Sequence, residues 1–174
     1  MKDRARQPSD PVWQPSPAAS GAFRHWLKTK DSLTQRLQTA FADFRVANVS
    51  QHWAHPLPDE ACLLGLRPDQ TALVREVWLQ SGEKPLVFAR SVLPRNSLRG
   101  AWRDLGRLGS RPLGAVLFAD RRVARTPLMF YKLPRHHPIS RRVGQAGLWA
   151  RRSVFLQAGR AILVTEIFLP GVLA

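Results

Sequence analysis

Three charged side chains interrupt stretches of sequence that otherwise have the apolar alternation of buried β-strands: Arg75, Arg90 and Glu166. Burying an unpaired charge is unfavourable by several kcal/mol, so each needs a partner of opposite charge, a proton or a ligand. Guanidinium groups match carboxylates through two parallel hydrogen bonds, and apolar surroundings strengthen each contact. Two arginines with one glutamate therefore suit a small organic dianion. The alternative is a buried Arg–Glu network that only holds the sheet together.

Glu166 belongs to the last of the expected strands. Residues 148–157 and 161–169 are predicted to form a hairpin that turns through Ala158-Gly159-Arg160. The second of these strands is apolar on both faces, which predicts a central position in the sheet. Alternation then places Glu166 at the middle of an apolar face.

The two arginines lie on an earlier hairpin, predicted over residues 72–79 and 86–93 with a turn at 81–84. Each strand has one arginine among apolar neighbours. Glu166 is likewise a charged residue on an apolar strand, but its charge is negative. Arg75 shares a strand face with Leu73, Val77 and Leu79, because successive side chains alternate.

The remaining elements complete an α+β fold. Residues 1–19 are rich in proline and polar residues and are expected to form a flexible arm, with Trp13 attaching it to a single domain over 20–174. Ser32 and Gln35 have the spacing of a capping box. Further strands are predicted at 44–50 and 128–133, loops at 52–69 and 134–142, and helices at 20–28, 33–41, 97–108 and 113–118. The predicted class is one antiparallel sheet of about six strands, with helices covering one face or one edge.

The composition excludes several other kinds of site. A single cysteine, Cys62, excludes an intramolecular disulfide and leaves no cluster with zinc-site spacing. The sequence contains no glycine-rich phosphate loop and no nucleophile elbow. It also has no apolar run of signal-peptide or membrane-spanning length, so we expect a soluble cytoplasmic protein.

The chain is strongly basic, with 27 Lys+Arg against 12 Asp+Glu and a formal net charge of +15. Such a charge permits nucleic-acid binding. However, the basic residues are scattered and do not alternate with aromatic residues, as a stacking surface for single strands would require. The same field would attract a small dianion. Charge alone does not decide between these two partners.

Several segments, in order, resemble the chorismate pyruvate-lyase family. The resemblance spans about residues 23–170. No single segment is diagnostic, but the order of the segments and the spacing between them are specific. The matching segments are KDSLTQRL (30–37), LVREVWL (73–79), FARSVLP (88–94), LGSRPLGAVLF (108–118), GLWARRS (147–153) and LVTEIFLP (163–170).

The resemblance implies a six-stranded antiparallel sheet whose helical flaps cover a buried site. It implies elimination of pyruvate from chorismate to give 4-hydroxybenzoate, the first committed step toward ubiquinone, without metal or organic cofactor. Carried over by motif, Arg75 would bind the ring carboxylate, Arg90 would help to hold the enolpyruvyl carboxylate, and Glu166 would contact the ring hydroxyl end as a general acid/base or a positioning group. Leu113 and Leu33 would line the pocket and flap. Leu33 stands where a methionine is expected, a swap that preserves apolar volume.

The same resemblance leaves a second function open. Regulator domains of related fold bind small molecules without catalysis, so a non-catalytic domain that binds an aromatic carboxylate is the alternative. Such domains normally accompany a DNA-binding segment, and the first 20 residues are too short and proline-rich for a helix-turn-helix. A monomer with no obligatory nucleic-acid partner is expected.

Overall fold

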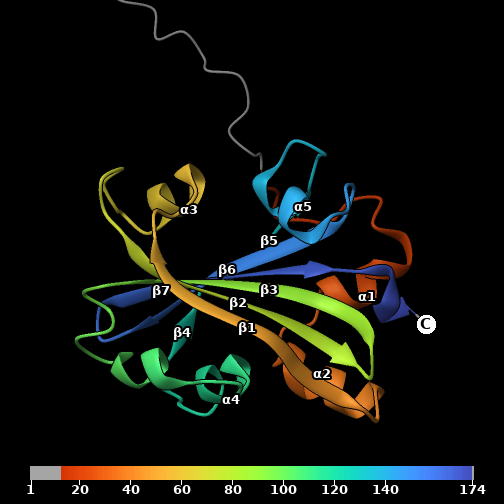
Figure 1. The fold of residues 1–174 in the computed structure, drawn as a ribbon, viewed down its shortest axis with the longest axis horizontal. Coiled ribbons are helices and arrows are strands. Elements are labelled where there is room, and N and C mark those ends of the chain that lie inside the picture. The colour runs from red at the N-terminus through yellow and green to blue at the C-terminus, as the bar shows by residue number, and fades with distance from the viewer. Residues whose placement is uncertain (1–12, 174) are drawn as a thin grey trace, which may run out of the picture.

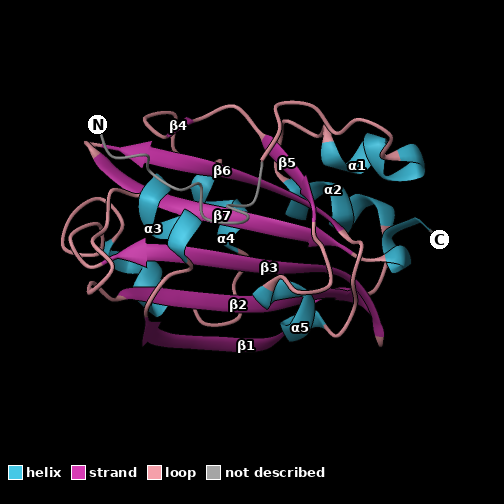
Figure 2. Ribbon diagram, turned by 90° about the horizontal axis from the view of Figure 1, so that it is seen from above, coloured by secondary structure: helices cyan, strands magenta, loops and turns pink. Residues whose placement is uncertain are grey.

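The computed structural model describes residues 13–173 and contains one antiparallel sheet in the order β1-β2-β3-β7-β6-β4, with β5 also paired to β6 (Figures 1 and 2). The α+β class is confirmed, and all six predicted strands are present. The two-residue β4 makes a seventh. As predicted, β7 lies inside the sheet, between β3 and β6. The strands are β1 (Phe44–Ala54), β2 (Ala72–Ser81), β3 (Lys84–Pro94), β4 (Ala124–Arg125), β5 (Met129–Lys132), β6 (Trp149–Gln157) and β7 (Arg160–Phe168).

Short helices lie on both faces of the sheet rather than on one face or edge. Figure 1 shows α2 and α4 on one side of the strands and α3 and α5 on the other. The helical segments are η1 (Gly21–Phe23), α1 (Arg24–Leu27), α2 (Leu33–Ala40), α3 (Pro58–Leu63), η2 (Arg103–Arg107), α4 (Leu113–Leu117), α5 (Pro138–Val143) and η3 (Pro170–Leu173). The predicted cap of α2 is present, since the Ser32 side chain accepts a hydrogen bond from the backbone N–H of Gln35.

Two helices arise where loops were predicted, and one predicted helix is missing. Both α3 and α5 begin with a proline, whose fixed φ suits the first helical position. Residues 97–108 form turns and η2 instead of a continuous α-helix. There the Ser97 hydroxyl donates to the Ala161 carbonyl and the Trp102 indole N–H to the Arg160 carbonyl, which holds the segment against β7.

Each sheet face packs against its own helices. On the face of α2 and α4, the core contains Leu37, Val77 and Phe168, and continues through Leu113 and Phe155. On the opposite face, α5 packs on Phe88 and Ile167 through Ile139. No helix within residues 13–173 is both long and apolar enough to cross a membrane.

The predicted arm is attached from Trp13 onward, while residues 1–12 of it lie outside the described residues. The Trp13 indole N–H donates to Asp59 Oδ2 at 3.1 Å. The Arg152 guanidinium lies 4.1 Å from the centre of the Trp13 ring, and Tyr131 packs on the same ring. Trp13 therefore attaches this segment to the sheet, as expected from the sequence.

Candidate active site

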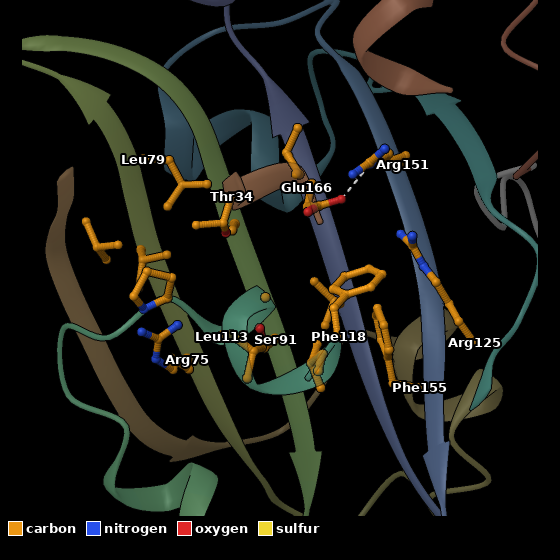
Figure 3. A pocket seen from close by; sticks show the side chains of 18 residues that line it. Thr34, Arg75, Leu79, Ser91, Leu113, Phe118, Arg125, Arg151, Phe155 and Glu166 are labelled. Carbon is orange, nitrogen blue, oxygen red and sulfur yellow. Dashed lines mark hydrogen bonds and ion pairs between the residues drawn. The ribbon is translucent and has the colours of Figure 1, made fainter. Parts of the chain in front are cut away.

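A cavity lies between the sheet and the two helices α2 and α4 (Figure 3). Strands β2, β3, β7 and β6 form its floor, and Leu33 and Leu113 contribute to its walls from α2 and α4. Apolar side chains dominate the lining. Three arginines and one glutamate interrupt it: Arg75, Arg125, Arg151 and Glu166.

Strand register brings these charged groups to the same face. Arg75 is opposite Ser91 in the β2–β3 ladder, and Glu166 is opposite Ala89 on one side and Arg151 on the other. Residues directly opposite each other in an antiparallel sheet project to the same side. The charged groups therefore lie on neighbouring strands of one sheet, whose backbone hydrogen bonds fix the spacing of the site.

Arg75 is a buried cation that has no carboxylate partner in the part of the chain that the structure describes. Arg75 is only 3% exposed. Its Nη2 donates to the carbonyls of Gly109 and Arg111 at 3.0 and 3.1 Å. Among residues 13–173, its Nε has no hydrogen-bond partner and no carboxylate lies within ion-pair distance of it. Burial lowers the pKa of this guanidinium. A buried donor without a partner is suited to an anionic ligand.

Glu166 is paired with Arg151 rather than with Arg75. Nε of Arg151 donates to Glu166 Oε2 at 2.5 Å, the contact drawn in Figure 3. Nη1 of the same arginine donates to the carbonyls of Trp26, Leu27 and Thr29 at the end of α1. These bonds hold Arg151 in one orientation, and it in turn positions the Glu166 carboxylate at the cavity.

The cover of the cavity is formed where α2 and α4 meet. Gly114 on α4 lies so close to α2 that an added Cβ would be 3.0 Å from both Ser32 Oγ and Thr34 Oγ1. Leu33 and Leu113 are 3% and 9% exposed, which closes the apolar wall over the charged groups. The two helices thus enclose the cavity against water, which strengthens electrostatic interactions inside it.

Comparison with known proteins shows the family of this chain. The sequence profile of a family described as "Chorismate lyase" matches residues 6–173. The chain belongs to the chorismate lyase family. A probable chorismate pyruvate-lyase of Nitrosospira multiformis is 49% identical, covering 97% of each chain. One of Thiobacillus denitrificans is 47% identical over 89% of this chain and 86% of that protein.

Solved structures resemble the chorismate lyase fold at much lower identity. The PhnF C-terminal domain has a TM-score of 0.54 with 12% identity, covering 74% of this chain and 83% of that one. A GntR-family transcriptional regulator from Bacillus cereus has a TM-score of 0.52 with 10% identity, covering 74% and 92%. These similarities support the sheet architecture and say nothing about catalysis.

The expectation that Arg90 shares a dianion site with Arg75 and Glu166 is wrong. Arg90 lies on the opposite face, where Nε and Nη2 donate to the two oxygens of Glu60 at 2.8 and 2.9 Å and Nη1 donates to Glu76 at 2.9 Å. A register shift in the β2–β3 ladder after Leu79 causes this placement. Without the shift Arg90 would be opposite Arg75; with it, Arg90 is opposite Glu76.

Arg151 and Arg125 are the charged pocket residues that sequence reasoning missed in this chorismate lyase family member. A signal for Arg151 was available, since the tight turn at Ala158-Gly159 fixes the β6–β7 register and so places Arg151 opposite Glu166. No comparable signal existed for Arg125, because β4 has only two residues and pairs with β6 across a long separation in sequence.

Proposed function

We propose that this protein catalyses the elimination of pyruvate from chorismate to give 4-hydroxybenzoate, the reaction for which its relatives are named. The observation that carries the proposal is the charge of the cavity: three guanidinium groups against a single carboxylate, a formal surplus of two positive charges in an apolar enclosure. Chorismate has two carboxylates and a small ring, so its charge and apolar body complement this cavity. Membership of the chorismate lyase family supports the same conclusion.

The residue roles follow from position in the cavity. Arg75 binds the ring carboxylate, because its buried Nε is a donor without a hydrogen-bond partner among residues 13–173. Glu166 lies across the cavity from Arg75 in Figure 3, near the position that the hydroxyl-bearing carbon of the ring would occupy. Leu33 and Leu113 pack on the ring from above. Arg151 is a positioning residue that acts through Glu166.

The elimination needs little beyond orientation and proton transfer. The bond from ring carbon 3 to the enolpyruvyl oxygen breaks, carbon 4 loses its proton, and the departing oxygen takes up a proton to give pyruvate after tautomerisation. The ring becomes aromatic, which supplies the driving force. A carboxylate at the hydroxyl end is placed to accept the carbon 4 proton, and the surrounding guanidinium groups stabilise negative charge on the leaving oxygen. Neither a metal nor an organic cofactor is required.

The alternative is a binding domain without catalysis, which the structural similarity to regulator domains allows at the level of fold. One experiment separates the two functions. Purified protein is mixed with chorismate, with and without a chelator, and formation of 4-hydroxybenzoate is followed by absorbance. We expect turnover that the chelator does not change. Binding of 4-hydroxybenzoate without any turnover of chorismate would instead support the binding domain.

The monomeric state and the cytoplasmic location stay predictions. Sedimentation at several protein concentrations tests the first, and fractionation of the cells that express the protein tests the second. A steep salt dependence of duplex DNA binding would support the nucleic-acid alternative raised by the net charge. A weak, salt-insensitive interaction would leave attraction of small anions as the role of that charge.

A further inference from the structure

Arg125 occupies the junction of two cavities. It lines the buried cavity together with Glu166 and Arg151, and it also lines an outer groove beside Lys28 and Lys30. The groove has an apolar floor that includes Phe130. Arg125 thus lies between the buried cavity and the basic groove of Lys28 and Lys30.

The guanidinium of Arg125 is held rigidly but is not neutralised. Nε donates to Ser153 Oγ at 2.7 Å, and Nη1 donates to the Lys30 carbonyl at 2.8 Å. Its central carbon lies 5.5 and 5.1 Å from the ring centres of Phe118 and Phe155. No carboxylate among residues 13–173 lies within ion-pair distance of it, and Nη2 has no hydrogen-bond partner there. An orientated cation with a free donor is suited to an anionic ligand.

Arg125 is on the Glu166 side of the cavity rather than the Arg75 side, as Figure 3 shows. Burial lowers the pKa of Arg125 to about 10, while the nearby charge of Glu166 opposes this change and that of Arg151 adds to it. The other charged group that acts on it is Asp31, in the segment leading into α2. Arg125 is therefore close to Glu166, the proposed acid/base group.

This position matches the geometry of chorismate. The ring carboxylate is on carbon 1, the hydroxyl is on carbon 4 directly across the ring, and the enolpyruvyl arm is on carbon 3 beside it. With carbon 1 at Arg75 and carbon 4 at Glu166, the arm extends from the Glu166 end. Arg151 is a poor partner for it, because its Nε and Nη1 already donate to Glu166 and three carbonyls.

We infer that Arg125 binds the carboxylate of the enolpyruvyl arm, the role that the family resemblance had implied for Arg90. The inference rests on the proposed function, since it names the partner of the substrate's second carboxylate. Arg125 stabilises the arm as negative charge develops on its ether oxygen. It makes no comparable contact with 4-hydroxybenzoate, which has lost the arm.

The experiment compares a monoanion with a stable dianion that does not react. Calorimetry measures binding of 4-hydroxybenzoate and of 3-(carboxymethoxy)-4-hydroxybenzoate, which has a second, ether-linked carboxylate. For Arg125→Met we expect affinity for the dianion to fall about 10- to 100-fold, the range for one charge-assisted hydrogen bond. Affinity for 4-hydroxybenzoate should stay within about threefold. Arg121→Met, which replaces an exposed arginine four residues earlier, is the matched control and should change neither.

Several outcomes of these binding measurements would contradict the role of Arg125. Equal loss of both ligands by Arg125→Met would give Arg125 a structural role and overturn the inference, as would an unchanged affinity for the dianion. Arg125→Lys retains the charge and should restore part of the affinity for the dianion; no such recovery in a folded variant would also contradict the inference. Because binding needs no turnover, wild-type protein that binds the dianion but does not convert chorismate would refute the proposed function and leave the inference on Arg125 standing.

Discussion

Arg151 and Glu166 are directly opposite each other in the β6–β7 ladder, and their hydrogen bond engages one oxygen of the carboxylate. Oε1 of Glu166 has no hydrogen-bond partner among residues 13–173, so this oxygen can face the ligand. The arginine fixes the orientation of the group that we propose as acid/base.

Glu166→Gln should abolish proton transfer without disturbing the site. Glutamine has the same length and still accepts a hydrogen bond from Arg151, but it does not accept a proton from the substrate. We expect kcat to fall about 10²- to 10⁴-fold, the usual contribution of a general acid or base. Affinity for 4-hydroxybenzoate should change far less. Steady-state kinetics and calorimetry measure both quantities, and a variant that keeps its kcat would show that Glu166 only positions the substrate.

Arg75→Met should separate binding from stability. The substitution removes a buried cation that has no carboxylate partner, so the melting temperature should not fall, although two bonds to carbonyls are lost. Affinity for 4-hydroxybenzoate should fall about 10- to 100-fold with the loss of a charge-assisted contact. Arg103→Met, at an exposed position, is the control. A large drop in melting temperature with normal affinity would assign Arg75 to the scaffold.

Arg90→Met should lower stability and leave substrate binding unchanged, the reverse of what we expect for Arg75→Met. The substitution leaves Glu60 and Glu76 buried without their shared cation, although Glu76 retains its contact with Arg142 at 2.9 Å. Breaking a buried pair in this way lowers the free energy of unfolding by about 3–5 kcal/mol. The folded fraction should retain the KM of the wild type, because Arg90 does not line the cavity.

A matched control for Arg90→Met is Arg45→Met, which breaks the exposed pair with Glu83 and should change stability by less than about 1 kcal/mol. Urea unfolding measures both variants, and kinetics on the folded proteins measure KM. A raised KM for Arg90→Met with unchanged stability would return this arginine to the binding site.

Gly114→Ala should accelerate product release. The new Cβ would be 3.0 Å from Ser32 Oγ and Thr34 Oγ1, and since Ser32 Oγ caps α2, we expect α2 and α4 to separate by a few tenths of an ångström. A looser cover should raise the dissociation rate of 4-hydroxybenzoate, which stopped-flow fluorescence measures. Gly106→Ala is the control, since its Cβ would meet only Leu98 at an ordinary 3.9 Å. Equal dissociation rates for the two variants would exclude this contact as the barrier to release.

His137 should make stability depend on pH near neutrality. Its ring is buried, and burial lowers its pKa below the usual 6.5, while the nearby Asp59 and Glu60 oppose this shift. The unfolded chain therefore binds the proton first as pH falls, so stability is complete above about pH 6.5 and is lost below it. The neutral Nδ1 also accepts the N–H of Ile139 at the start of α5.

The variant His137→Asn tests this prediction, because asparagine can accept the same hydrogen bond and does not titrate. Melting temperatures measured between pH 5 and pH 8 should fall for the wild type below about pH 6.5 and change less for the variant. Parallel curves for the two proteins would show that other groups cause the pH dependence.

The sequence predicted the sheet more fully than the site. Alternation, turn residues and apolar runs identified six strands, and the last hairpin has a tight turn that leaves no freedom of register. The first hairpin differs because its ladder shifts by one residue after Leu79, and this shift moves Arg90 to the other face. The sequence around residues 79–87 does not reveal such a bulge, so the partner of Arg75 could not be predicted from alternation alone.

Helices α3 and α5 show a second limit of sequence reasoning. Both have only six residues and begin with a proline, so their polar, proline-containing sequences have the composition of loops. Their stability comes from tertiary contacts, as when Glu60 of α3 pairs with Arg90 of β3. Such contacts link residues far apart in the chain, and no local pattern records them.

Neighbouring positions of one strand belong to different parts of the molecule. Arg75 faces the cavity while Glu76 joins the ion pairs behind the sheet, and Arg151 contacts Glu166 while Arg152 pairs with Asp59 on the far side. Substitutions at adjacent positions of one strand should therefore affect different properties, one the chemistry of the cavity and the next the stability of the fold. A lineage could exchange the ion pairs behind the sheet for apolar packing, and gain or lose heat tolerance, while its chemistry stayed the same.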